Sequence, residues 1–256
     1  MYDFKNIIDY SNELLFNIVH FKHNRNLRAQ ILINQIYFTA IQALPLVSLI
    51  AFFTGVSVVE VGHALVGGTE SKWIFEILVA VGIRDVAPVV TSAIILLRSG
   101  NAITTELGAM RVEKEIDALI SLGISPISYL VTPRVVGMFF SSMLLGIYFA
   151  MISVLGGFFI FYLFNGISLN DFMYQLSRVL TVNDLFLLFF KSLFSGAIVG
   201  AICTYYGLQK SHMITEIPQK NIKAVTISAI SLILFNLAIV FLEILNSDLI
   251  GYIKYA

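Results

Sequence analysis

Two ionisable residues, Asp85 and Lys191, interrupt stretches of sequence that are otherwise mostly apolar. An ionisable side chain in hydrocarbon costs about 2.5–3.5 kcal/mol, so it usually faces a cavity, an opposite charge or the lipid–water interface. Three interpretations stay open: an ion pair between two helices, a pathway for an ion or proton, and a Lys191 side chain that reaches the headgroups. Arg84 lies about 100° from Asp85 on a helix, so we expect Arg84 to anchor at the outer interface instead. Glu243 is also expected to be interfacial.

The chain has none of the residue patterns that catalysis or metal binding would need. No His-x-x-x-His pair or carboxylate pair falls inside an apolar stretch, and the histidines are scattered: His20, His23, His63 and His212. The acidic cluster of Glu113, Glu115 and Asp117 is more typical of a solvated helix face than of a metal site. A single cysteine, Cys203, excludes a disulfide framework. We expect no cofactor, no metal ion and no catalytic residue.

The composition excludes an ordinary soluble protein. Hydrophobic residues make up 58% of the 256 positions, before 17 glycines are counted, whereas soluble domains have about 45–50% with glycine included. Only 12% of residues are charged, and 16 basic residues balance 16 acidic ones. This balance gives no reason to expect nucleic acid as a partner. The class that remains is an all-α, polytopic membrane protein.

Five stretches are long and apolar enough to cross about 30 Å of hydrocarbon as helices. Three are free of charge, and two are interrupted, the second by Glu76, Arg84 and Asp85 and the fourth by Lys191. Pro45 is expected to bend the first span, and the second is expected to continue toward Ile103. The expected spans are residues 35–59, 74–97, 135–164, 185–208 and 224–242.

The distribution of Lys and Arg predicts the orientation of these spans. With the N-terminus inside, the inner segments contain eleven Lys and Arg residues and the outer segments contain three. An excess of positive charge on cytoplasmic segments is the usual pattern of membrane proteins. We therefore expect a cytoplasmic N-terminus and an external C-terminus.

Residues 1–34 are expected to form a separate N-terminal unit, ahead of a five-span domain over residues 35–256. Apolar residues recur there at helical spacing, at positions 4, 7, 8, 14, 15 and 18, with polar residues mostly opposite. This pattern predicts an amphipathic helix. It either lies at the inner membrane interface and braces the bundle or packs on a soluble partner.

The connection between the second and third spans, residues 106–134, is too patterned for a simple turn. Val112, Ile116, Leu119 and Ile120 form an apolar stripe over about 111–122, while Glu113, Lys114, Glu115 and Asp117 lie away from it. Gly123 and Pro126 are expected to end this helix. A short charged helix between two spans either transmits movement from a soluble partner, as a coupling helix does, or rests on the bilayer.

Three motifs in and around this connection resemble the signature of the MlaE/YrbE family of ABC transporter permeases. They are ELGAM at residues 106–110, KEIDAL at 114–119 and ISPISYLVTPR at 124–134; upstream, RDVAPV at 84–89 is similar to a further family unit. The sequence departs from the family in having Lys114 and Glu115 where Glu-Gln is common, and Asp85 in place of Glu. Asn236 stands near a position where some members carry an acidic residue.

The resemblance implies a permease subunit that moves phospholipid between the inner and outer membranes of a bacterium. It further implies a homodimer in the inner membrane, a separate ABC ATPase and a periplasmic MCE-domain protein. By the same resemblance, Asp85, Lys191 and Asn236 would lie at the lipid pocket. Glu113, Lys114, Glu115 and Asp117 would dock the ATPase. The chain itself has no G-x-x-x-x-G-K-[ST] loop for nucleotide phosphates.

Two other functions compete with this one. A membrane-embedded enzyme needs a general acid or base constellation, which the sequence does not offer. An ATP-independent secondary transporter or channel is the alternative, because Asp85 and Lys191 could serve an ion or proton pathway. Such transporters often consist of two similar halves around a midplane site, and no internal repeat is visible here.

Overall fold

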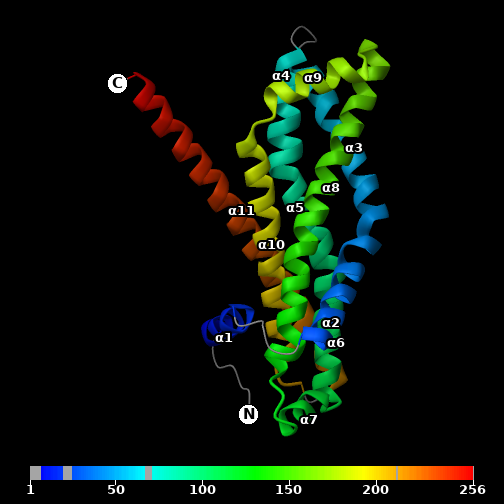
Figure 1. Ribbon diagram of the computed structural model, residues 1–256, viewed down its shortest axis with the longest axis vertical. Coiled ribbons are helices and arrows are strands. Elements are labelled where there is room, and N and C mark those ends of the chain that lie inside the picture. The colour runs from blue at the N-terminus through cyan, green and yellow to red at the C-terminus, as the bar shows by residue number, and fades with distance from the viewer. Residues whose placement is uncertain (1–6, 20–24, 67–70, 212, 256) are drawn as a thin grey trace.

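Long helical runs dominate the computed structural model, which describes residues 7–19, 25–66, 71–211 and 213–255 (Figure 1). No strand occurs within these ranges. The first half of the chain forms α1 (Ile7–Val19), α2 (Arg25–Thr39), η1 (Ile41–Ala43), α3 (Leu44–Val66), α4 (Ser71–Ile77), η2 (Leu78–Val86), α5 (Ala87–Ile95), η3 (Leu96–Gly100) and α6 (Asn101–Val112). The second half forms α7 (Glu115–Ser121), η4 (Ile127–Val131), α8 (Thr132–Asn165), α9 (Leu169–Val179), α10 (Val182–Leu208), η5 (Ile214–Glu216) and α11 (Ile217–Tyr255).

Five helical runs are long and apolar enough to cross a membrane, which confirms the expected all-α polytopic fold. They are Gln30–Leu65, Trp73–Val112, Ile127–Phe164, Val182–Leu208 and Ile214–Leu245. Each contains the corresponding stretch expected from sequence. The first is interrupted at η1, which ends two positions before Pro45. Pro45 is the second residue of α3, a first-turn position where its missing amide hydrogen removes no helical hydrogen bond.

The second run extends further than expected and contains two π-helical stretches, η2 and η3. It reaches Val112, beyond Ile103, since the polar residues of α6 continue the helix past its apolar part. A π-helical turn holds one more residue than an α-turn, and such turns are frequent at functional sites. η2 contains both Arg84 and Asp85, so the wider turn changes the direction of these two side chains.

α8 is the central helix of the bundle, packed along α3 on one side and α10 on the other. The small residues Ser192, Gly196, Gly200 and Thr204 recur every four positions on α10, as predicted for helix packing. A Cβ atom on Gly196 would lie 2.5 Å from Cβ of Ser142 on α8. The two backbones therefore approach closely at this crossing.

α9 lies across one end of the bundle, and α7 lies at the opposite end (Figure 1). An aromatic cluster holds α9 in place: the rings of Phe75 and Phe161 stack with centroids 4.8 Å apart, and Phe172 of α9 lies 5.0 Å from Phe75. Ser168 caps α9 by accepting a hydrogen bond from the Asp171 amide. These ends are called here the α9 end and the α7 end.

α1 packs against the side of the bundle near the α7 end (Figure 1). Tyr10 and Leu14 are buried in a small cluster with Ile127 and Val135, whereas Leu15 and Phe16 of the same helix are exposed. Within its described part, α1 therefore has one buried face and one exposed face. Phe4 and Lys5 lie outside the described residues. The chain resumes as α2, which continues across residue 34 into the first span.

α11 leans away from α10 toward the C-terminal end of the helix (Figure 1). Only 17% of its most apolar stretch is buried, against 50% for the second and third spans. Leu234, Leu237 and Phe241 are among its exposed large side chains. One face of this span is therefore left uncovered by the described part of the single chain.

Candidate functional site

Asp85 and Lys191, the two charges that interrupt the apolar stretches, form an ion pair. Nζ of Lys191 lies 2.7 Å from Oδ1 of Asp85 and 2.9 Å from Oε1 of Glu243. The three side chains come from η2, α10 and α11. The Lys191 side chain is fully buried, so it meets its counter-charges inside the bundle rather than extending to the headgroups. Of the three, the Asp85 side chain is the most exposed, at 39%.

Arg84 joins the same cluster, contrary to the expectation that it points away from Asp85; its anchoring at the outer interface stays a prediction. Its guanidinium lies 3.5 Å from Oδ1 of Asp184 and 3.4 Å from Oε2 of Glu243. The separation of about 100° assumed α-helical turns, but η2 is π-helical here. Glu243 also offers one oxygen to each cation, which links Arg84 to Lys191. Its expected interfacial position stays a prediction.

Asp184 ties this charge cluster to the start of α10. Its Oδ2 accepts hydrogen bonds from the Thr181 amide at 3.0 Å and the Thr181 hydroxyl at 2.7 Å. The Asp184 amide donates back to the Thr181 hydroxyl at 3.3 Å, completing a capping box. Oδ2 of Asp184 therefore caps the start of α10, while Oδ1 of the same carboxylate pairs with Arg84.

An apolar groove lies between α5 and α11, with a volume of about 420 Å³. Its lining is Val89, Ser92, Ala93, Leu96, Ala229, Leu232, Ile233, Asn236, Leu237 and Val240. Glu243 follows Val240 by three positions, and Val89 follows Asp85 by four, so helical spacing places the charge cluster next to the groove on both walls. The groove is thus mostly apolar, with Ser92 and Asn236 as its polar lining residues, and it is charged beside one end.

Asn236 lies in this groove and not in the charge cluster. It is seven positions, about 10 Å along the helix, from Glu243 on the same face. Its amide donates a hydrogen bond to the Leu232 carbonyl at 2.9 Å. The three residues expected at one pocket are therefore arranged as an Asp85–Lys191 pair and, two turns away, a polar group inside the adjoining groove.

The expected charged helix of the α7 end is present over Glu115–Ser121, shorter than residues 111–122. Arg111 and Val112 belong to α6, and the break falls at Lys114, which has a left-handed backbone with φ of 61°. Gly123 ends α7 with φ of 75°. The Gly123 and Ile124 amides bond to the carbonyls of Ile120 and Leu119, which is the Schellman arrangement.

One ion pair and one buried side chain fix α7 on the bundle. Arg111, almost buried, lies 2.9 Å from Asp117, and Ile116 of the apolar stripe is 2% exposed. Nearby, Arg134 pairs with Glu106 at 2.7 Å. Glu113, Lys114 and Glu115 are exposed, as is Asp117 on the side away from Arg111. The four residues expected to dock a partner are thus all accessible at the α7 end.

No metal site accompanies these clusters within the described residues: no group of three His, Cys, Asp or Glu side chains is placed to hold an ion there. The histidines at 20, 23 and 212 lie outside the described residues. His63 packs on the ring of Phe161, with centroids 5.2 Å apart.

Comparison with known proteins agrees with this architecture. The sequence profile described as Permease MlaE matches residues 32–242, which covers all five spans apart from the ends of the first and last. The chain belongs to the MlaE permease family. It is a multi-pass membrane protein.

Several relatives carry names of the same kind. A probable ABC transporter permease protein of Synechocystis is 31% identical over 60% of this chain and 58% of its own length. One from Rickettsia prowazekii is 25% identical over 80% of both chains. The Arabidopsis thaliana protein TRIGALACTOSYLDIACYLGLYCEROL 1, chloroplastic, is 30% identical over 58% of this chain. The match spans only 43% of that plant protein's length.

Sequence reasoning found the Asp85–Lys191 pair but missed two features of the site. One is the joint role of Arg84, Asp184 and Glu243, for which the available signal was the position of Asp184 and Glu243 directly beside the ends of two apolar stretches. The other is the groove between α5 and α11. Its signal was the seven-residue spacing of Asn236 and Glu243 on one helix face.

Proposed function

We propose that the chain is the permease subunit of an ABC transporter that moves phospholipid between the inner and outer membranes of a bacterium. Family membership supports the transporter class, and the relatives' names support the ABC type. The observation that carries the cargo assignment is the groove between α5 and α11, mostly apolar in its lining and flanked by the charge cluster at one end. Acyl chains suit the first part and a polar headgroup suits the second.

The α7 end is the proposed cytoplasmic end, where a separate ABC ATPase docks. The eleven-to-three excess of Lys and Arg supports this orientation, with the N-terminus inside. The fixed position of α7, with Glu113, Lys114, Glu115 and Asp117 accessible, supports its use as the docking element. A helix held rigidly on two spans can pass a partner's displacement to them.

Two further parts of the assembly follow from the family resemblance. A second copy of this chain would cover the exposed face of α11 and close the groove, giving a homodimer in the inner membrane. A periplasmic MCE-domain protein would receive or deliver lipid at the α9 end. Within each copy, residues 1–34 would act as an interfacial helix and residues 35–256 as the permease domain.

Filling the groove tests the cargo assignment. Ala93→Phe places a large side chain in the groove, so the variant should retain several-fold less phospholipid than the parent when both are purified in mild detergent. Ala64→Phe on α3, an exposed alanine outside the groove, is the matched control. The readout is phospholipid per mole of protein by mass spectrometry. Equal phospholipid retention in all three proteins would contradict the groove as the cargo site.

A further inference from the structure

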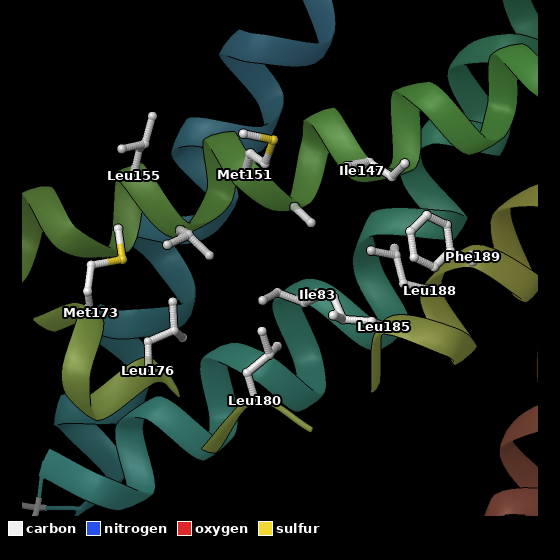
Figure 2. A pocket seen from close by; sticks show the side chains of 12 residues that line it. Ile83, Ile147, Met151, Leu155, Met173, Leu176, Leu180, Leu185, Leu188 and Phe189 are labelled. Atoms are coloured by element: carbon white, nitrogen blue, oxygen red, sulfur yellow. The ribbon is translucent and has the colours of Figure 1, made fainter. Parts of the chain in front are cut away.

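A second apolar pocket lies beneath α9, on a different part of the bundle from the groove. Figure 2 shows side chains of α8, α9 and α10 converging on it, with Ile83 of η2 at its inner wall. Its volume is about 300 Å³, all twelve lining residues are apolar, and none of them lines the groove between α5 and α11. This space is called the α9 pocket.

The α9 pocket is open on the outer surface of the bundle and closed toward its centre. Met151 and Leu155 of α8 and Met173 of α9 are 63%, 46% and 42% exposed, so they form the mouth. Ile83 and Leu188 are almost fully buried and form the floor. The residues from α8 and α10 lie within the third and fourth membrane spans, so the mouth faces the lipid bilayer.

The chemistry of the lining limits what can fill this space. Water needs two to four polar partners to occupy a cavity, and an apolar cavity of this kind stays dry. Left empty, the lining atoms would have no contact partners on one side. In a membrane, lipid hydrocarbon lies outside the mouth of the pocket. Met151 and Met173 have unbranched, flexible side chains, which can adapt to a flexible ligand.

The position of α9 sets the depth of the pocket. Phe172 and Leu176 of α9 are buried toward the bundle, while Asp171 and Arg178 are exposed. An amphipathic helix of this kind lies at the boundary of hydrocarbon and headgroups. A chain entering below α9 therefore has its polar end at the level where lipid headgroups lie.

We propose that the α9 pocket binds one acyl chain of a membrane phospholipid, as a lateral lipid site separate from the groove between α5 and α11. The site depends on the membrane-spanning architecture alone. Its failure would leave the proposed transport function untouched, and the reverse also holds.

Photolabelling of the full chain in phosphatidylethanolamine nanodiscs tests this proposal. The probe is a phosphatidylethanolamine with a diazirine midway along one chain, and labelled positions are found by peptide mass spectrometry. Label should concentrate on residues 147–155 and 173–180, above its level at the exposed stretch 162–164 of α8. Val154→Phe fills the pocket and should reduce this label roughly tenfold, whereas Val61→Phe, at an exposed site on α3, should leave it unchanged.

The smaller substitution Ala150→Leu provides a second filled pocket with less risk to folding. Label spread evenly over all exposed residues of α8 would overturn the proposal, since it would indicate ordinary bilayer contact. Label that persists at the pocket in both filled variants would also overturn it. A parallel experiment uses the diazirine-bearing free fatty acid, and labelling by that probe alone would show that the occupant is not a phospholipid.

Discussion

At the scale of single residues, Lys191 has the most demanding environment in the described part of the chain. Its fully buried ammonium group is shared between Asp85 and Glu243, and Arg84 neutralises the other oxygen of Glu243. Removing one member of a buried ion pair leaves an uncompensated charge, which typically costs about 3–5 kcal/mol. The cluster therefore couples η2, α10 and α11 whatever ligand it contacts.

Lys191→Met should destabilise the protein by about 3 kcal/mol or more, because two carboxylates would then face each other without a shared cation. Adding Asp85→Asn should recover part of the loss, since it removes one of them. Thermal unfolding in detergent measures both effects. Lys223→Met, at an exposed position on α11, is the control and should change stability little. A loss of stability no larger than this control's would mean that the cluster is not a structural link.

The Asp85–Lys191 pair was predictable from sequence as one of three alternatives, because two opposite charges in hydrocarbon gain most by meeting. The role of Arg84 was not, since the prediction placed it on an α-helix and the π-helical η2 turns it differently. Glu243 is 52 positions away from Lys191, and no local pattern indicates that α11 returns to this point. Tertiary packing determines both the contacts of Arg84 and the position of Glu243 beside Lys191.

At the scale of elements, a buried hydrogen bond adds to the apolar contacts that dock α1. The Tyr10 hydroxyl lies 2.7 Å from Oγ1 of Thr204, whose own hydrogen is donated to the Gly200 carbonyl at 2.6 Å. The phenol of Tyr10 is therefore the donor. Burial raises the pKa of the Tyr10 phenol above its ordinary value, and the hydrogen bond to Thr204 offsets this only in part.

Because the folded-state pKa is raised, the Tyr10 contribution to α1 docking is present below about pH 10 and is lost as the pH rises above it. A spin label at Asn12→Cys, on the exposed face of α1, should show constant mobility from about pH 6 to about pH 9 and greater mobility at higher pH. Tyr10→Phe should weaken docking by about 1 kcal/mol and abolish the alkaline change. An alkaline change of equal size in that variant would assign it to another group.

The crossing of α8 and α10 is sensitive to single methyl groups. A Cβ on Gly196 would lie 2.5 Å from Cβ of Ser142 and 2.6 Å from the Met138 carbonyl, whereas the nearest atom to a Cβ on Gly200 is 3.3 Å away. Gly196→Ala should therefore cost about 1–3 kcal/mol through overpacking, and Gly200→Ala clearly less. Thermal unfolding in detergent compares the two. Equal losses would mean that the helices move apart freely.

The helical spans were more predictable from sequence than the breaks between helices. Long apolar runs, three of them free of charge, located all five spans, and Gly123 was correctly expected to end the helix after the second span. The break between α6 and α7 was not predicted, because Lys114 adopts a left-handed backbone that sequence rarely assigns to lysine. The apolar stripe runs through this break, so periodicity alone reads α6 and α7 as one helix.

At the scale of the whole molecule, the bundle has accessible charged residues at its α7 end and two apolar openings along its sides. The groove between α5 and α11 and the α9 pocket have separate linings, so they provide two places for hydrocarbon on one chain. Neither was predicted from sequence, because apolar residues line every surface of a membrane bundle and the spacing of Asn236 and Glu243 marks only one wall of the groove. Only the three-dimensional arrangement separates a pocket from a packed face.

The central claim is that this chain is a phospholipid permease driven by a separate ABC ATPase. The most direct test purifies the tagged protein from its own membranes in mild detergent and identifies all retained proteins and lipids by mass spectrometry. The account predicts an ABC ATPase, an MCE-domain protein and phospholipid. It also predicts that Glu115→Lys, which reverses an exposed charge on α7 without breaking the Arg111–Asp117 pair, loses the ATPase and keeps the lipid. A chain that retains neither ATPase nor lipid, while other membrane complexes survive the same treatment, would contradict the claim and favour an ATP-independent transporter.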